Sequence, residues 1–466
     1  MEIFAIWNIW VIISFSHPDT MWTKTYGGSN DDVGCAILTV DDGYIVAGYT
    51  NSFGPTFGNV WLLKINQQGD IIWTKIYDSG KDYDDAKSIQ PTSDGGYLLV
   101  GNAGLGTVDG DIWVIKTDAN GDTIWTKKFD GGHGDFGHFG CETSEGGYIV
   151  VGSSYRNYAY RWWVLKLNSS GDTIWTRLAS HASAGLAVRE TPDHCYIVAG
   201  SYNIYRTVDK LWLIKLDSTG SIIWDQTYDG LSGGRSIEIA PNGDLIITGS
   251  TLWGGNGDMY LLRVDPQGNE IWRKTYDRGE EECGRCVRQT PDGGYIIVGY
   301  SGHNPPYLIY IVRTDSFGDT LWTWLYEGSG NWDDGWSVDI CNDGGYIISG
   351  AIDSEGWDLH LIKTYPEAKI AETRFNSPPI IKIFPNPFNK KVNVYFQLNR
   401  PACVKISLYD ISGKKLKEKS LGVRTPGKHS IPIEIEKSPN GIYFLKVKLA
   451  DTISTFKIIK NKASAH

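Results

Sequence analysis

A tryptophan recurs seven times along the chain, at intervals of 51, 52, 50, 49, 48 and 50 residues. A repeat of this length indicates stacked supersecondary units, each of which buries its apolar face against the next. The seven residues are Trp22, Trp73, Trp125, Trp175, Trp224, Trp272 and Trp322. This period constrains the fold more strongly than any local propensity does.

Each unit also contains a short apolar run that follows a turn and ends in glycine, as in YIVAG at Tyr44. Such runs predict strands, and their lack of clean alternation indicates that both faces are covered. Each unit is therefore predicted to be a four-stranded antiparallel meander, with strands a to d. The glycine within strand b is expected to let a neighbouring sheet approach closely. These glycines are Gly48, Gly101, Gly152, Gly200, Gly249, Gly299 and Gly350.

Seven such sheets predict an all-β chain with a seven-bladed β-propeller over residues 20–365. The chain enters with a lone d strand at Met21–Tyr26, and the last unit has no d strand after Leu359–Lys363. Docking the first strand onto the last sheet would close the ring and remove two exposed sheet edges. An open solenoid would leave both edges unpaired, so we expect closure by the N-terminal strand.

The first residues form an apolar stretch that is too short to cross a bilayer. Residues 1–19 resemble a secretory signal peptide, or a remnant of one, with Ser14 and Ser16 at a small-x-small cleavage site. Glu2 departs from the basic start that such peptides have. This segment predicts export.

Charge divides the chain. Residues 1–379 contain 27 Lys+Arg against 49 Asp+Glu, a net −22, whereas residues 380–466 contain 17 against 5, a net +12. The acidic propeller argues against nucleic acid as a partner, because phosphate binding needs concentrated Lys and Arg. Residues 366–380 have the composition of a linker. Short β-rich runs over 381–461 predict a small β-sandwich.

The runs IFPNPFNKKVNVYFQL, VKISLYDISGKKL and NGIYFLKVK resemble the type IX secretion C-terminal sorting domain. The matching positions are Pro385, Asn386, Pro387, Phe388, Gly413, Gly441 and Tyr443. The resemblance implies an immunoglobulin-like sandwich over 381–461 that the outer-membrane secretion machinery recognises. It implies a secreted or outer-membrane surface-attached protein. An ordinary immunoglobulin-like accessory domain is the alternative. The repeats, from Trp22 to about Lys363, resemble bacterial and archaeal surface propellers of unassigned activity.

The common catalytic motifs GxSxG, HExxH and GxxxxGK[ST] are missing from the sequence. Hard oxygen ligands suit calcium, and paired aspartates recur before strand a. These are Asp31, Asp32, Asp84, Asp85, Asp333 and Asp334. Aspartates that cap the turn would explain them equally well. His133, Asp135 and His138 share one glycine-rich loop, for which we favour a solvated loop over a metal site.

Two further patterns have structural explanations. Cys283 and Cys286 form CGRC, which could close as a disulfide in an exported protein or remain as free thiols. The c–d hairpin, as in KINQQGDIIW, is similar to the tryptophan-docking turn of quinone-dependent dehydrogenases. Those enzymes usually have eight blades, and here every repeat tryptophan occupies an equivalent position, so packing between sheets is favoured and no cofactor is expected.

The tryptophans outside the repeat positions are the main functional signal. Four of them are assigned to the d–a or b–c loops, which emerge on one face of a propeller, and tyrosines join them there. The candidate ligand-binding residues are Trp253, Trp332, Trp336, Trp357, Tyr155, Tyr158, Tyr202 and Tyr205. Aromatic rings beside Asp and Asn suit sugar rings. The alternative is that these side chains pack under their own loops.

The sequence thus favours an exported, non-enzymatic binding or adhesion propeller, a monomer whose ligand is a polysaccharide or a surface protein. The alternative is a secreted carbohydrate-active hydrolase or lyase that uses carboxylates on the loop face, since glycoside hydrolysis needs paired carboxylates. Asp84, Asp333 and Asp334 are the candidates for that role. A purely structural surface-layer component is a third hypothesis.

Overall fold

The computed structural model describes residues 17–461 except 56, 106–108, 157, 181–182, 203–209, 253–255, 303–304, 329–330, 354–355, 368–380, 387, 399–401, 412, 426, 436–437 and 450–451. The chain divides into two compact units, Met1–Ala368 and Lys369–His466. All regular structure in the described ranges is β. Nowhere in those ranges is there a helix long and apolar enough to cross a membrane. The predicted leader, with Ser14 and Ser16, lies outside the described residues as far as residue 16.

The first unit contains seven four-stranded antiparallel sheets, the blades. Blade 1 is β2 (Asp32–Val40), β3 (Gly43–Thr50), β4 (Asn59–Asn66) and β5 (Ile71–Tyr77), and blade 2 is β6 (Asp85–Pro91), β7 (Tyr97–Ala103), β8 (Asp111–Thr117) and β9 (Thr123–Phe129). Blade 3 is β10 (Asp135–Glu142), β11 (Tyr148–Arg156), β12 (Ala159–Leu167) and β13 (Thr173–Leu178), and blade 4 is β14 (Ser183–Glu190), β15 (Tyr196–Tyr202), β16 (Lys210–Leu216) and β17 (Ile222–Tyr228). Blade 5 is β18 (Ser232–Ile239), β19 (Leu245–Ser250), β20 (Met259–Val264) and β21 (Glu270–Tyr276), and blade 6 is β22 (Glu282–Gln289), β23 (Tyr295–Ser301), β24 (Leu308–Thr314) and β25 (Thr320–Tyr326). Blade 7 is β26 (Asp334–Ile340), β27 (Tyr346–Asp353), β28 (Trp357–Thr364) and the N-terminal β1 (Thr20–Tyr26).

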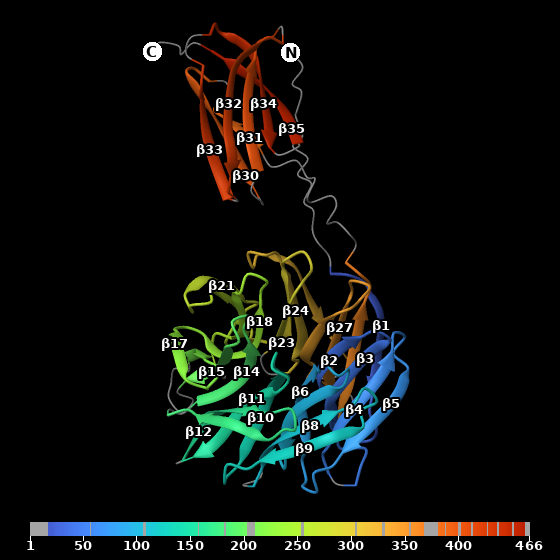
Figure 1. Cartoon of the computed structure of the whole chain (residues 1–466). Coiled ribbons are helices and arrows are strands. Elements are labelled where there is room, and N and C mark those ends of the chain that lie inside the picture. Colours follow the sequence, from blue (N-terminus) through green and yellow to red (C-terminus); the bar gives the residue numbers. More distant parts are fainter. Residues whose placement is uncertain are drawn as a thin grey trace. The chain divides into compact units, whose positions relative to one another are not determined.

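The blades are arranged around an axis, as Figure 1 shows. Strand a of each blade packs against strand a of the next, and β26 of blade 7 packs against β2 of blade 1. The predicted all-β fold with seven four-stranded sheets is therefore confirmed. The d–a and b–c connections lie at one end of the axis, which we call the d–a face. The a–b and c–d turns lie at the other end.

Hydrophobic side chains fill all seven junctions between neighbouring blades. In β3, Ile45 and Ala47 face blade 2, whereas Tyr44 and Val46 face blade 7. Both faces of each blade are thus buried, which is why the strands read as continuous apolar runs. The seven repeat tryptophans all pack against these clusters, as predicted.

In six of the seven blades, strand d also contacts the c–d turn of the next blade. The Trp125 indole donates to the Ser169 carbonyl at 3.2 Å, and Lys127 pairs with Asp172 at 2.9 Å. Gly171 has φ +80°, and a Cβ there would lie 2.8 Å from the Trp125 ring. The turn glycine and the tryptophan therefore require each other, which accounts for their shared period.

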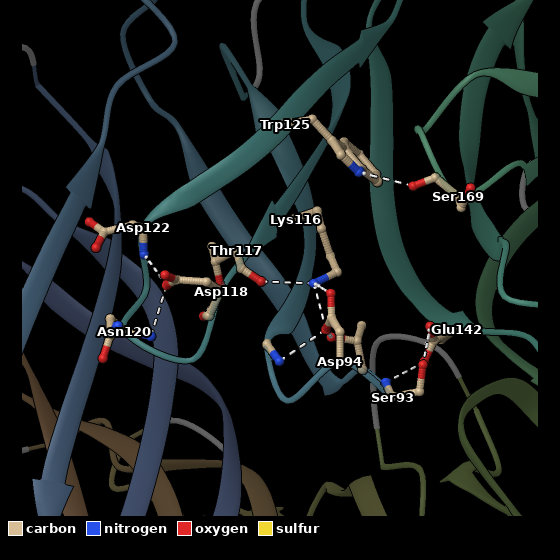
Figure 2. Close-up of polar contacts among 12 residues, drawn as sticks. Ser93, Asp94, Lys116, Thr117, Asp118, Asn120, Asp122, Trp125, Glu142 and Ser169 are labelled. Atoms are coloured by element: carbon tan, nitrogen blue, oxygen red, sulfur yellow. Dashed lines mark hydrogen bonds and ion pairs between the residues drawn. The ribbon is translucent and has the colours of Figure 1, made fainter.

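A second repeated contact fixes the a–b turn to strand c. In blade 2, the Lys116 ammonium lies 2.8 and 2.9 Å from the two Asp94 oxygens and also donates to the Thr117 carbonyl (Figure 2). Ser93 of the same turn donates to Glu142 of blade 3. Lysine or arginine pairs with turn aspartate at this place in six blades: Lys64–Asp42, Lys116–Asp94, Lys215–Asp193, Arg263–Asp244, Arg313–Asp292 and Lys363–Asp343.

The strand b glycine is required first by a contact within its own blade. Strand a of every blade has a one-residue bulge opposite it, and the bulge turns a strand a carbonyl toward the glycine. A Cβ at Gly299 would lie 1.8 Å from the Cys283 oxygen, and one at Gly48 would lie 1.8 Å from the Val33 oxygen. The closest approach therefore occurs within one blade. The neighbouring blade also comes close, since a Cβ at Gly152 would lie 2.7 Å from Ile112 of blade 2 and one at Gly350 would lie 3.2 Å from Ile309 of blade 6.

β1 supplies strand d of blade 7 and pairs with β28 in six register positions. Blade 7 has no c–d turn, and residues at the two ends of the propeller segment take its place. His17 stacks on Trp324 with ring centroids 4.5 Å apart, Asp19 accepts from the Tyr365 amide, and Glu367 accepts from the Trp322 indole at 2.9 Å. Residues 17–19, assigned to the leader, and Glu367, assigned to the linker, thus contact the propeller.

We predict that a buried histidine at this seam makes the propeller acid-sensitive. His360 is 5% exposed and lies 3.1 Å from the Thr25 hydroxyl and 2.9 Å from the Tyr326 hydroxyl. Burial lowers its pKa to about 4, so the unfolded state takes up a proton first, below about pH 6.5. This contribution to stability is complete above that pH and falls by about 1.4 kcal/mol per pH unit down to about pH 4. When Tm is measured from pH 7 to pH 4, it should fall less steeply in His360→Gln than in wild type. Parallel curves for the variant and wild type would contradict this role.

The second unit consists of two sheets that share one core. One contains β29 (Ile381–Phe384), β30 (Lys391–Leu398) and β33 (Gly427–Glu434). The other contains β31 (Ala402–Tyr409), β32 (Lys415–Arg424), β34 (Gly441–Leu449) and β35 (Thr452–Lys460). This is the predicted small sandwich; its immunoglobulin-like classification stays a prediction.

Candidate functional site

The bulge in strand a directs one residue of each blade toward the propeller axis. The seven residues are Cys35, Lys87, His138, Leu186, Arg235, Arg285 and Trp336. All seven line one cavity of about 100 Å³, to which Arg189 and Arg288 also contribute. Because each bulge lies near the start of strand a, this ring is nearer the d–a face.

The cavity lining contains five cationic side chains and no carboxylate. Carboxylates stand beside some of these cations. Lys87 pairs with Asp85 at 2.7 Å, and the Arg285 Nε and Nη2 groups donate to the two Asp334 oxygens at 2.9 and 2.5 Å. Lys87 and Arg285 keep 25% and 16% of their side-chain surface accessible. The site is therefore a solvent-accessible cationic cavity within an acidic propeller.

Two neutral groups report the environment of this cavity. The pKa of His138 falls to about 3 because of its burial and of the nearby Lys87 and Arg235 charges, so it is a neutral imidazole at pH 7. The Trp336 indole packs against the Arg285 guanidinium at 3.9 Å. Its buried Nε1–H has no hydrogen-bond partner among the described residues.

An aromatic path leads from the d–a face to the cavity. Trp332 stacks on Tyr307 with centroids 4.3 Å apart and planes at 14°. Tyr307 contacts Tyr300 edge-on at 5.6 Å, and the Arg285 guanidinium lies 5.3 Å from the Tyr300 ring. Arg285 therefore belongs both to this path and to the axial ring, at the junction of blades 6 and 7.

The outer end of the path is exposed and fixed in place. Trp332 is 41% exposed. Tyr307 donates its amide to the Asn331 carbonyl and accepts from the Asp333 amide, both at 2.9 Å, so the b–c and d–a loops of this junction are joined. The Tyr300 hydroxyl donates to Glu281 at 3.0 Å. We call Trp332, Tyr307 and Tyr300 the rim.

The structure separates the other predicted aromatic residues. Trp336 was expected in a loop but lies in β26, and Trp357 is the first residue of β28 and packs on Val33, Cys35 and Ala351. Tyr155 and Tyr202 lie in β11 and β15 rather than in loops. Tyr158 is 92% exposed in a turn. Trp253 and Tyr205 lie outside the described residues.

Tyr202 lines a separate groove between blades 3 and 4. This groove has a volume of about 360 Å³ and also contains Trp162, Trp212, Lys210 and Asp225. Trp162 and Trp212 are only 2% and 5% exposed. The groove therefore offers fewer accessible ring faces than the rim does.

The predicted calcium aspartates are spread over three blades, and those at equivalent positions have structural contacts. The aspartate two residues before the glycine or alanine of strand a caps a turn: Asp32 accepts from the Gly28 amide, Asp84 from Ser79 and Asp333 from Gly328. Asp135 and Glu282 do the same in blades 3 and 6. Asp85 and Asp334 instead pair with axial cations, and Asp31 accepts from the Trp357 amide. These contacts support the turn-capping explanation.

Carboxylates converge at two other places that the sequence did not reveal. Asp111, Asp130 and Asp135 bring oxygens within 4.8 Å of one another, and so do Asp258, Asp277 and Glu282 at the equivalent junction of blades 5 and 6. Burial raises the pKa of Asp135, Asp258 and Glu282. These oxygen sets could hold a divalent cation, although Lys81 already pairs with Asp111 at 2.8 Å.

The histidine loop does not form a cluster. Asp135 and His138 lie in β10, where His138 faces the axis, while His133 packs on Tyr155. Cys283 and Cys286 are buried free thiols in β22. The interpretation of residues 133–138 as a solvated loop was therefore wrong for the axial histidine.

The sorting-motif residues fasten the start of the sandwich to its last strand. Asn386 exchanges hydrogen bonds with Lys457 and Ile459, and Phe388 is 4% exposed in the core. Gly413 has φ +84° in the turn that Asp410 closes. Gly441 begins β34, where Tyr443 is buried, and Pro387 lies outside the described residues. The motif therefore has a structural role in closing this domain.

Comparison with family models gives a match in the second unit. Residues 382–461 match the family described as secretion system C-terminal sorting domain. No curated protein matches the chain.

Solved structures are similar at low identity. A Bacteroides caccae protein of unknown function is 14% identical, with a TM-score of 0.40, covering 61% of this chain and 94% of that one. PorZ, a surface component of the type IX secretion system of Porphyromonas gingivalis, is 11% identical, with a TM-score of 0.44 and 94% and 60% coverage. The Pan2 WD40 domain of Neurospora crassa is 11% identical, with a TM-score of 0.47 and 71% and 89% coverage.

The family match covers nearly all of the second unit and coincides with the predicted sorting motif. The chain is thus a β-propeller that carries a type IX C-terminal sorting domain, which directs it to secretion and attachment at the cell surface.

Proposed function

We propose that this protein is a surface-attached binding propeller that holds a saccharide at the rim of the d–a face. The observation that carries the proposal is the exposed Trp332 ring, stacked on Tyr307 and fixed by two backbone hydrogen bonds. A fixed aromatic ring can stack on the apolar face of a sugar at little entropic cost.

Polar groups beside the rim support recognition of sugar hydroxyls. Glu281 and Arg285 flank Tyr300, so acceptor and donor groups lie next to the aromatic surface. Two of the predicted aromatic residues lie near this site: Trp332 is part of the rim, and Trp336 packs on Arg285. Trp357 packs against the same small cluster as Trp336. A ligand at this position would lie at the junction of blades 6 and 7.

The alternative of a carbohydrate-active hydrolase or lyase has less support. Asp333 caps the turn at Gly328, Asp334 is held by Arg285, and Asp84 caps a turn between blades 1 and 2. Glycoside hydrolysis needs two carboxylates about 5–10 Å apart that reach the substrate. The contacts of these three side chains favour binding without catalysis.

We predict that Trp332→Ala weakens saccharide binding at least tenfold, about 1.4 kcal/mol. Stability should change by only about 1 kcal/mol, because the ring loses one aromatic contact at the surface. A glycan array on the full chain, with calcium or with a chelator, identifies the saccharide, and calorimetry then compares the variant with wild type.

Phe317→Ala is the matched control, because Phe317 is 51% exposed in the c–d turn of the same blade at the opposite face. It should bind as wild type does. Equal affinity in Trp332→Ala and wild type would exclude the rim, and a large loss of stability would show that Trp332 is a core residue.

A further inference from the structure

We infer that the axial cavity is an anion site for the carboxylate or sulfate group of an acidic saccharide. The anion site follows from the cavity itself, whereas its occupant rests on the proposed saccharide function. Seven bulges place Cys35, Lys87, His138, Leu186, Arg235, Arg285 and Trp336 around one space.

The charge of the lining is opposite to that of the propeller. Residues 1–379 carry a net −22, yet the cavity is lined by Lys87, Arg189, Arg235, Arg285 and Arg288 and by no carboxylate. A low-dielectric cleft lined by one sign of charge focuses the field and concentrates counter-ions. Anions are therefore drawn to the axis of an otherwise anion-repelling surface.

The carboxylates behind this lining do not cancel it. Asp85 and Asp334 pair with Lys87 and Arg285 of the ring of bulge residues, nearer the d–a face. Further along strand a, Arg288 lies between Glu238 at 2.8 Å and Asp339 at 3.6 Å. These four carboxylates stand behind the lining, so the side chains that face the cavity itself include five cations and no carboxylate.

Burial first, and then the nearby positive charges of Lys87 and Arg235, lower the pKa of His138, which agrees with a cationic lining. Trp336 also lines the cavity, with its indole packed on the Arg285 guanidinium at 3.9 Å.

The volume of the cavity and its place beside the rim indicate which chemical group it could bind. A cavity of about 100 Å³ corresponds to about three water molecules at about 30 Å³ each, which suits a carboxylate or sulfate group better than a sugar ring. Arg285 and Trp336 join this cavity to the rim. An acidic substituent of a saccharide bound at Trp332 would have to extend past Tyr307 and Tyr300 to reach Arg285 and the axis.

The test titrates the full chain with sodium sulfate, D-galacturonate and D-galactose at constant ionic strength. We expect sulfate and galacturonate to bind and galactose to bind at least tenfold more weakly. Lys87→Met/Asp85→Asn removes the cation with its partner and should weaken both anions at least tenfold. Lys24→Met/Asp70→Asn removes an ion pair on the propeller exterior and should leave anion binding within twofold of wild type.

Should the axial double variant fail to fold, crystals of the wild-type chain soaked in sodium selenate provide the decision. An anomalous peak between Lys87, Arg235 and Arg285 supports the inference. Equal anion binding in both double variants, or a selenate peak only elsewhere, overturns it. Trp332→Ala separates the two proposals. It should weaken the binding of saccharides and leave the binding of free sulfate unchanged. If saccharide binding is also unchanged in this variant, the proposed function is refuted and the anion site is not.

Discussion

Gly299→Ala should destabilise the propeller by about 3 kcal/mol or more, at or above the upper end of the range that overpacking a core usually costs. A Cβ at this position would lie 1.8 Å from the Cys283 carbonyl oxygen and 3.1 Å from the Gly284 Cα. Both are backbone atoms, so no side chain can move aside. The strain would be relieved by flattening the bulge of β22, which would also move Arg285 away from the axis.

Tryptophan fluorescence provides the measurement, because residues 381–461 contain no tryptophan, so apart from Trp7 and Trp10 near the N-terminus the signal comes from the propeller. Gly293→Ala is the control in the same blade. It has φ +83° with its nearest atom 3.9 Å away, so it should cost only about 1–2 kcal/mol for the left-handed backbone. Equal losses in the two variants would show that the bulge does not depend on the strand b glycine.

Deleting residues 17–26 should remove most of the stability of the propeller. β1 forms six register pairs with β28, and each backbone hydrogen bond contributes about 1 kcal/mol. Trp22, Lys24 and Tyr26 also hold the c–d turn of blade 1 through Gln67, Asp70 and Gly69. The combined loss is comparable to the whole stability of a domain, about 5–15 kcal/mol.

The truncated chain should therefore lose its cooperative thermal transition or form oligomers through the edge of β28. A synthetic peptide of residues 17–27 added in trans should restore the transition, and a scrambled peptide should not. A truncated monomer with an unchanged Tm would show that the ring is stable without β1.

The number and type of the blades could be predicted because the repeat contains their stabilising contacts. Trp125 and Gly171 illustrate this, since the indole stacks on a turn that only glycine can form. The bulge could not be predicted, because it depends on the register between strands a and b. For that reason the contact of Gly48 and its equivalents with strand a of their own blade was not predicted.

The axial site was missed for the same reason. Trp336 follows Gly335 in an acidic segment that looks like a loop, and His138 lies in a glycine-rich one. One signal was available: a glycine or alanine precedes the bulged residue in every unit, and that next residue varies from cysteine to lysine, histidine, arginine and tryptophan. A variable, charged position inside an apolar strand indicates a residue that faces a cavity.

Hydrogen–deuterium exchange of the full chain, with and without the saccharide that the glycan array identifies, tests the central claim most directly. We predict slower exchange in the bound state at residues 299–308 and 331–337, which contain the rim and Trp336, and at the start of β22 near Arg285. Exchange in the c–d turns at the opposite face should not change. Protection confined to the groove beside Tyr202 and Trp212, or to the sorting domain, would contradict the assignment of the rim as the binding site.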